Sequence, residues 1–136
     1  MASLTIKPRL IYTLLCDDVR QEMGGKFSLM GLFESISSHS FPAIHHRFVI
    51  MNEWTGGKGE FTVQIRLLSP DQSQIISESE TKLTLFGENQ RHRDISVRHN
   101  TTFKVPGTYW IETLLDGERV GLTPIVLQTV NDQMIH

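Results

Sequence analysis

The sequence predicts an all-β protein whose strands form an antiparallel sandwich or barrel. Short segments of β-type residues alternate with turn signals at intervals of roughly 8–14 residues, a spacing typical of such folds. No long window repeats its apolar side chains with the period of about 3.6 residues that a helix requires, although residues 17–23 (DDVRQEM) could form one helical turn. The 136 residues contain no internal repeat or long linker, so we expect a single domain over residues 1–136.

The first half of the chain predicts three strands and one hairpin. Residues 10–16 (LIYTLLC) are apolar on both faces, as in a central strand. Gly24-Gly25 separates 19–23 from 26–33 and predicts a hairpin turn, because glycine accepts positive φ angles without steric cost. Residues 46–52 (HRFVIMN) predict a further strand with an apolar centre.

The middle of the chain contains the clearest strand pattern. The glycines in 56–59 predict a hairpin loop, and residues 61–67 then alternate strictly between apolar and polar side chains. Residues 74–86 predict a solvated edge strand or a pair of strands, residues 87–94 a polar loop, and residues 95–105 a less regular strand.

The last third predicts a second hairpin. Pro106-Gly107 forms a turn, and residues 109–115 follow as a strand with Tyr109 and every second residue on one face. Asp116-Gly117 is the strongest hairpin signal in the chain, and residues 119–129 return as the last strand. Pro124 lacks a backbone N–H, so we expect a kink or an edge position there.

Composition and charge narrow the functional classes. Thirteen Lys and Arg against fifteen Asp and Glu give a net charge of −2, which argues against bulk nucleic-acid binding. From this charge we expect no nucleic-acid partner. No apolar stretch approaches the roughly 20 residues that cross a bilayer, so we also expect no membrane partner. Cys16 is the single cysteine and lies in an apolar run, which predicts a buried, inert thiol and suits a reducing, cytoplasmic location.

Residues 106–121 (PGTYWIETLLDGERVG) are similar to the last hairpin of many immunoglobulin-like sandwiches. In those domains a Pro-Gly turn leads into a strand with an inward tyrosine and returns through Asp-Gly, and Tyr109 holds that place here. The resemblance implies an immunoglobulin-like β-sandwich. One departure is the absence of an inter-sheet cysteine pair, so neither Trp54 nor Trp110 has a disulfide to pack against.

Residues 16–33 (CDDVRQEMGGKFSLMGLF), followed by a Phe41-Pro42 step, resemble a family of small bacterial proteins catalogued as a domain of unknown function. Together the two resemblances extend over nearly the whole chain. The family brings no established substrate, cofactor or catalytic residue, so the resemblance implies a fold and nothing about activity.

Two groups of side chains are candidate metal sites. Asp17, Asp18 and Glu22 could bind a hard cation such as Ca²⁺ through oxygen ligands, although nearby basic residues could equally neutralise them. His45 and His46 are neighbours on one strand and point to opposite faces, so they cannot chelate one ion without a bulge. Surface or capping roles are the more common use of both groups, and we expect no metal and no cofactor.

Three further features are candidate binding elements. The basic residues within 91–99 could meet phosphate or an acidic protein, but no aromatic residue is interleaved with them, which favours a solvated loop. The glycines of 56–59 lack phosphate-loop spacing, and no nucleophile elbow or catalytic set is recognisable. Trp110 shares a face with Glu112 and Leu114, opposite the inward Tyr109, and this face is a candidate interaction surface.

We therefore expect a non-catalytic binding or structural module that contacts an unknown protein partner or associates with itself. The alternative is a metal- or small-ligand-binding sandwich, with enzymatic activity left open, that uses the acidic cluster or the histidines. The two hypotheses differ in whether residues distant in the sequence converge into a site.

Overall fold

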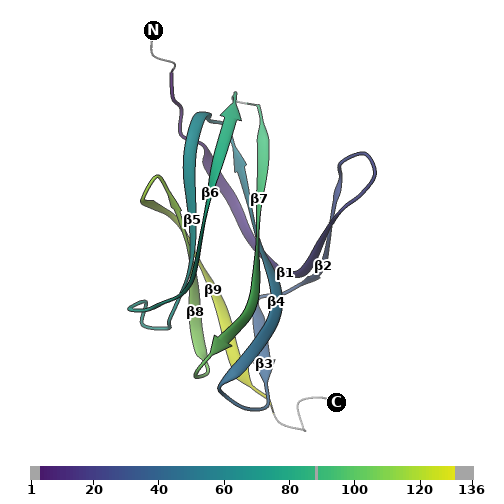
Figure 1. The fold of residues 1–136 in the computed structure, drawn as a ribbon, viewed down its shortest axis with the longest axis vertical. Coiled ribbons are helices and arrows are strands. Elements are labelled where there is room, and N and C mark those ends of the chain that lie inside the picture. Colours follow the sequence, from purple (N-terminus) through teal and green to yellow (C-terminus); the bar gives the residue numbers. More distant parts are fainter. Residues whose placement is uncertain (1–3, 88, 131–136) are drawn as a thin grey trace.

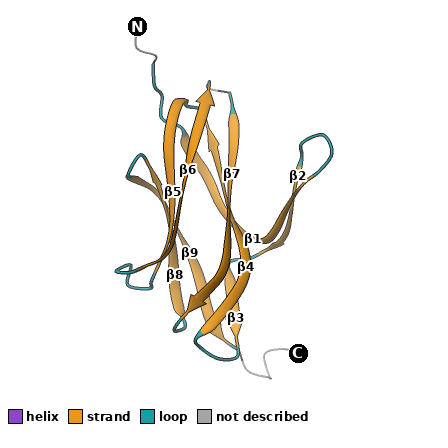
Figure 2. Cartoon of the chain, in the orientation of Figure 1, coloured by secondary structure: helices purple, strands orange, loops and turns teal. Residues whose placement is uncertain are grey.

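The computed structural model describes residues 4–87 and 89–130, and this part of the chain is all β. It contains nine strands and no helix, hence no helix able to cross a membrane (Figure 1, Figure 2). The predicted all-β class is therefore confirmed, and residues 17–21 continue a strand instead of forming a helical turn. The strands are β1 (Arg9–Gln21), β2 (Phe27–Leu32), β3 (Ser35–Ser38), β4 (Ala43–Thr55), β5 (Lys58–Leu68), β6 (Ile75–Phe86), β7 (Arg91–Phe103), β8 (Gly107–Leu115) and β9 (Glu118–Thr129).

The strands form two sheets. One has four strands in the order β2-β1-β4-β7, and the other has five in the order β3-β9-β8-β5-β6. All neighbouring strands are antiparallel except β3 and β9, which run parallel, so the expectation of purely antiparallel pairing is wrong at this edge. Parallel pairing is possible here because β3 and β9 lie far apart in the sequence and need no hairpin between them.

The turn at Gly56 and Gly57 carries the chain from one sheet to the other. The prediction of a hairpin over 56–59 is wrong, because β4 and β5 belong to different sheets and Lys58 already starts β5. Both glycines have positive φ angles, 70° and 88°, which tighten the turn. A Cβ added to Gly57 would lie 2.8 Å from the Cβ of Pro8, so the turn also packs closely against the N-terminal segment.

The connection from β6 to β7 also changes sheet, and it is shorter than the loop predicted for 87–94. β7 begins at Arg91, because the side chains that follow find partners in the four-stranded sheet. Arg91 and Arg93 pair with the Glu53 carboxylate of β4, and Asp94 accepts a hydrogen bond from β4. These charged residues are therefore strand residues with specific partners.

The other two predicted hairpins, at Gly24-Gly25 and Asp116-Gly117, are confirmed. Gly24 and Gly25, each with a φ angle of 88°, join β1 to β2. Asp116 and Gly117, with φ angles of 47° and 83°, join β8 to β9. Pro124 pairs with Trp110 of β8, and among the described strands no other pairs with β9 at this position, because β3 begins to pair at Val126.

The hydrophobic core lies between the two sheets. The alternation predicted for 61–67 is confirmed, because its four apolar side chains are each at most 3% exposed. Phe103 and Tyr109 pack edge-to-face with their ring centroids 5.0 Å apart. Burial of these side chains is the main contribution to folding stability. Other core residues are Leu15, Phe48, Ile50, Trp54, Leu83, Leu85, Ile111, Leu115, Ile125 and Leu127.

The end of β1 and all of β2 form an arm at the side of the four-stranded sheet (Figure 1). The first part of β1 pairs with β4, whereas beyond Cys16 the strand pairs with β2 alone. Gly31, with a φ angle of 70°, lies beside Asp17 at this point, and a Cβ there would collide with the Asp17 carboxylate. The arm contacts the sheet again at β7, where the Arg93 guanidinium lies 5.7 Å from the centre of the Phe27 ring.

Candidate binding site

Trp110 lies on the outer face of the five-stranded sheet. It pairs across the strands with Leu68 on β5 and with Pro124 on β9, so the three side chains share this face. Trp110 is half-buried, whereas Glu112 and Leu114 on the same face are each only 7% exposed. Of the three residues of the candidate surface, Trp110 therefore retains the most accessible area.

A row of alternating charges crosses this face next to Trp110. The Glu112 carboxylate lies 2.7 Å from Nη2 of Arg119 on β9 and 3.6 Å from Nη1 of Arg66 on β5. Arg66 also pairs with Glu78 on β6 at 3.2 Å. Because Glu112 is buried, it fixes the two arginines in position at the border of the apolar area.

The structure does not assemble the predicted acidic cluster into a metal site. Asp18 pairs with Arg47 of β4 at 3.1 Å, and the Asp17 carboxylate packs against Gly31. Glu22 belongs to the tip of the arm, where its backbone N–H donates to the carbonyl of Lys26. Within residues 4–87 and 89–130, no three His, Cys, Asp or Glu side chains lie in a position to hold a metal ion.

The two neighbouring histidines have separate environments. The His45 ring packs against Phe33 and Phe48, with centroid distances of 6.1 and 5.6 Å, and burial lowers its pKa. His46 is exposed and its Nδ1 lies 3.3 Å from Oδ1 of Asn100. His45 and His46 therefore lie in different surroundings, as their neighbouring positions on one strand predicted.

Glu53 is the centre of a polar cluster that the sequence did not reveal. Its side chain has no exposed area, and it accepts hydrogen bonds from Arg91 at 2.6 Å and from the hydroxyl of Tyr12 at 3.1 Å. Arg93 lies 3.0 Å away. Burial raises the pKa of Glu53, but the hydrogen bonds and the two positive charges outweigh it, so the pKa is lowered. The feature of the sequence that could have predicted this cluster is a glutamate within an otherwise apolar strand, since a buried carboxylate requires partners.

Arg98 lies in the interior, and the whole basic stretch within residues 91–99 belongs to β7, so the prediction of a solvated loop is wrong. It is 5% exposed and donates to the hydroxyls of Ser77 and Ser79, each at 2.9 Å, and to the carbonyl of Ile65 at 2.8 Å. All three acceptors are neutral, and its Nε has no partner among the described residues. Burial lowers the pKa of Arg98, and the charge of Glu78 acts in the opposite direction.

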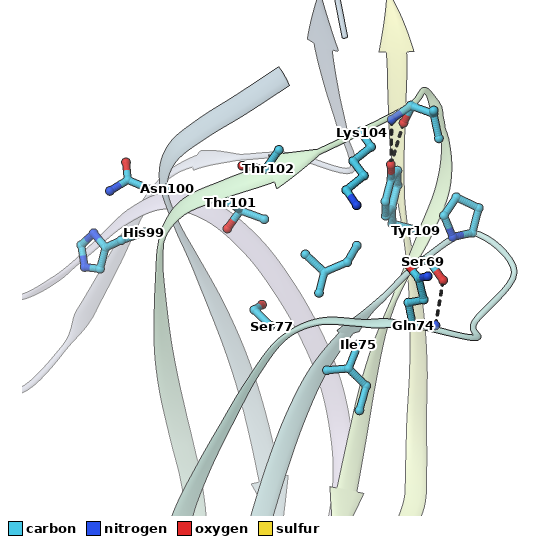
Figure 3. A pocket seen from close by; sticks show the side chains of 13 residues that line it. Ser69, Gln74, Ile75, Ser77, His99, Asn100, Thr101, Thr102, Lys104 and Tyr109 are labelled. Carbon is cyan, nitrogen blue, oxygen red and sulfur yellow. Dashed lines mark hydrogen bonds between the residues drawn. The ribbon is translucent and has the colours of Figure 1, made fainter. Parts of the chain in front are cut away.

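A cavity of about 620 Å³ lies where the start of β6 and the end of β7 separate, and we call it the β6–β7 cavity (Figure 3). The loop between β5 and β6 and the Tyr109 ring complete its walls. The Tyr109 hydroxyl already has a partner within the protein: it donates to the carbonyl of Val105 at 2.6 Å. The sequence could not reveal this cavity, because its walls come from separate segments that only the strand pairing brings together.

Comparisons with solved structures give distant likenesses. The alkylpurine DNA glycosylase AlkC of Pseudomonas fluorescens, bound to DNA containing an abasic site analog, is 15% identical with a TM-score of 0.46, over 70% of this chain and 28% of that one. A β-glucosidase from Listeria innocua in complex with isofagomine is 6% identical with a TM-score of 0.47, over 89% and 16%. This chain thus spans less than a third of either protein, and neither likeness bears on its function.

A comparison with curated proteins gives no match. A family model covers residues 11–128, which include both segments whose resemblances were noted in the sequence. The chain belongs to DUF6941, a family of unknown function.

Proposed function

We propose that the protein is a non-catalytic binding module that acts through protein–protein contact at the Trp110 patch. We define this patch as Trp110, Leu122, Pro124 and Val126, which lie on the outer face of β8 and β9. Pro124 is exposed, Val126 is 38% exposed, and Trp110 and Leu122 are half-buried. This accessible apolar area around an aromatic residue is the observation that carries the proposal, because tryptophan is enriched at the centres of protein interfaces.

The charged border of the patch supports the same proposal. Arg66 and Arg119 are already held by the buried Glu112 carboxylate before any partner binds. Side chains that are fixed in advance lose less conformational freedom on association. A partner with polar or acidic groups around an apolar centre would match this arrangement.

We also propose that the two sheets form a single immunoglobulin-like sandwich. Supporting this, β3 runs parallel beside β9 at one edge of the five-stranded sheet, and β1, β4 and β7 lie side by side in the other sheet. The hydrogen bond from the Tyr109 hydroxyl to the carbonyl of Val105 corresponds to the tyrosine corner of such domains. If the two sheets form one sandwich, the chain should unfold in a single cooperative transition. Deleting residues from either terminal strand should then destabilise both sheets together.

Site-specific photo-crosslinking in the native host tests the contact. A photoreactive residue replaces Val126 in the patch or, as a control, Phe86, which is 76% exposed at the end of β6. We expect a discrete product from position 126 that is lost when Trp110→Ala is added, and whose mass distinguishes a second copy from another protein. The same products from both positions, or no effect of Trp110→Ala, would refute the Trp110 patch as the contact surface.

A further inference from the structure

We propose that the β6–β7 cavity binds a small amphipathic carboxylate, meaning a molecule with one carboxylate group and an apolar body. This site is separate from the Trp110 patch. Its volume of about 620 Å³ falls within the range of about 300–1,000 Å³ that is usual for small-molecule sites. An inorganic anion alone would leave most of this space unfilled.

The walls of the cavity offer contacts to an apolar body. Pro70, Ile75, Ile76 and Val105 all line it, and Ile75 and Val105 are 50% and 53% exposed. These two side chains therefore have accessible area that a ligand would cover. Burial of apolar ligand surface against them supplies a non-directional contribution to affinity.

The polar part of the cavity favours negative charge. Among the residues that the structure describes, its lining includes Lys104 and His99 and no aspartate or glutamate. In Figure 3 the Lys104 side chain extends from the end of β7 into the space above Ser77 and Ile75. Lys104 forms no salt bridge with the residues that the structure describes. Its ammonium group is thus positioned to pair with a ligand anion.

A second positive charge lies directly behind the wall. Nη1 of Arg98 donates to the Ser77 hydroxyl oxygen at 2.9 Å, and Ser77 lines the cavity. Since that oxygen accepts from Arg98, its own O–H remains able to donate to a ligand. Among the described residues the buried guanidinium donates only to neutral acceptors, and Glu78 acts on it only through its charge, so an anion near Ser77 would add to the compensation of the Arg98 charge.

Together, the positive charges and the aliphatic side chains of the cavity favour a ligand with a single carboxylate over other charged ligands. A cation would meet the positive charges of Lys104 and Arg98, and no described residue of the lining offers it a carboxylate. One ammonium group and one hydroxyl donor match the two oxygens of a carboxylate, and the aliphatic side chains receive the rest of the molecule.

Calorimetric titration with octanoate, accompanied by amide chemical-shift mapping, tests the proposal. Octanol, which has the same chain length without the charge, is the matched ligand. We expect saturable octanoate binding, shifts centred on Ile75, Ser77 and Lys104, and clearly weaker binding of octanol. Lys104→Gln should weaken octanoate binding about tenfold, and Ser77→Ala should weaken it severalfold.

Lys82→Gln is the matched control, because Lys82 is an exposed lysine near the other end of β6. It should leave octanoate affinity unchanged, as should Trp110→Ala. Equal affinities for octanol and octanoate would show an apolar cavity without anion recognition. Equal losses in Lys82→Gln and Lys104→Gln would show non-specific attraction. Either result, or the absence of saturable binding, would overturn the proposed site.

Discussion

The indole N–H of Trp54 on β4 donates to the carboxylate of Asp94 on β7 at 2.5 Å, on the inner side of the four-stranded sheet. Asn52 lies 3.5 Å from the same carboxylate and accepts a hydrogen bond from Thr13. Asp94 is 7% exposed, and burial raises its pKa although Trp54, His92 and Asn52 act in the opposite direction. This chain of polar contacts joins β1, β4 and β7 through their side chains.

The raised pKa of Asp94 predicts a specific pH dependence. A carboxyl that binds its proton more tightly in the folded state stabilises the fold below its unfolded pKa of about 3.9, and this contribution is lost as the pH rises through the folded pKa. Asp94→Asn removes the titration and keeps an oxygen that can accept from Trp54. Urea denaturation across pH 3–7 should therefore show wild type losing stability relative to Asp94→Asn as the pH rises. A constant difference would contradict the prediction.

Glu53 should show the opposite pH dependence. Its pKa is lowered, so its stabilising contribution is present above the unfolded value of about 4.3 and is lost as the pH falls through the folded value. Glu53→Gln should reduce the free energy of unfolding by about 2 kcal/mol at pH 7, because it weakens the hydrogen bonds from Arg91 and Tyr12. Denaturation at pH 7 and pH 3 measures both effects. Glu60→Gln, at an exposed position of β5, should have little effect at either pH.

Gly31 should be necessary for the arm to pack beside β1. Gly31→Ala places a Cβ against the Asp17 carboxylate at a φ angle of 70°, so we expect a loss of about 2–3 kcal/mol and faster amide hydrogen exchange in β2. Gly24→Ala is the control, since a Cβ there meets no atom within 4 Å and adds only the backbone cost of about 1 kcal/mol. Equal losses in the two variants would mean that the contact with Asp17 is unimportant.

Cys16 should behave as an inert thiol in the folded protein. It has no exposed area, and burial, followed by the charge of Asp17, raises its pKa. Because the thiolate is the reactive form, labelling by a disulfide reagent at pH 8 should be at least about a hundredfold slower in buffer than in denaturing urea. Similar rates in both solutions would contradict the prediction of an inert thiol.

Local features of the sequence determined most of the strands and two of the three predicted hairpins. The alternation over residues 61–67 predicted the buried face of β5, because successive side chains of a strand point to opposite sides. Gly24-Gly25 and Asp116-Gly117 predicted their turns, because positive φ angles are cheap at glycine. These patterns depend only on residues close together in the sequence. They therefore predict strands and turns even when the pairing of the strands is unknown.

The partners of these strands depend on tertiary structure. Gly56 and Gly57 mark a tight turn in the sequence, but only the packing of two sheets decides that the chain changes sheet there. Arg98 belongs to a basic stretch, and only the approach of β6 to β7 places it between Ser77 and Ser79. The β6–β7 cavity and the Glu53 cluster arise in the same way. Long-range strand pairing sets which side chains meet, and no periodicity along the chain encodes that pairing.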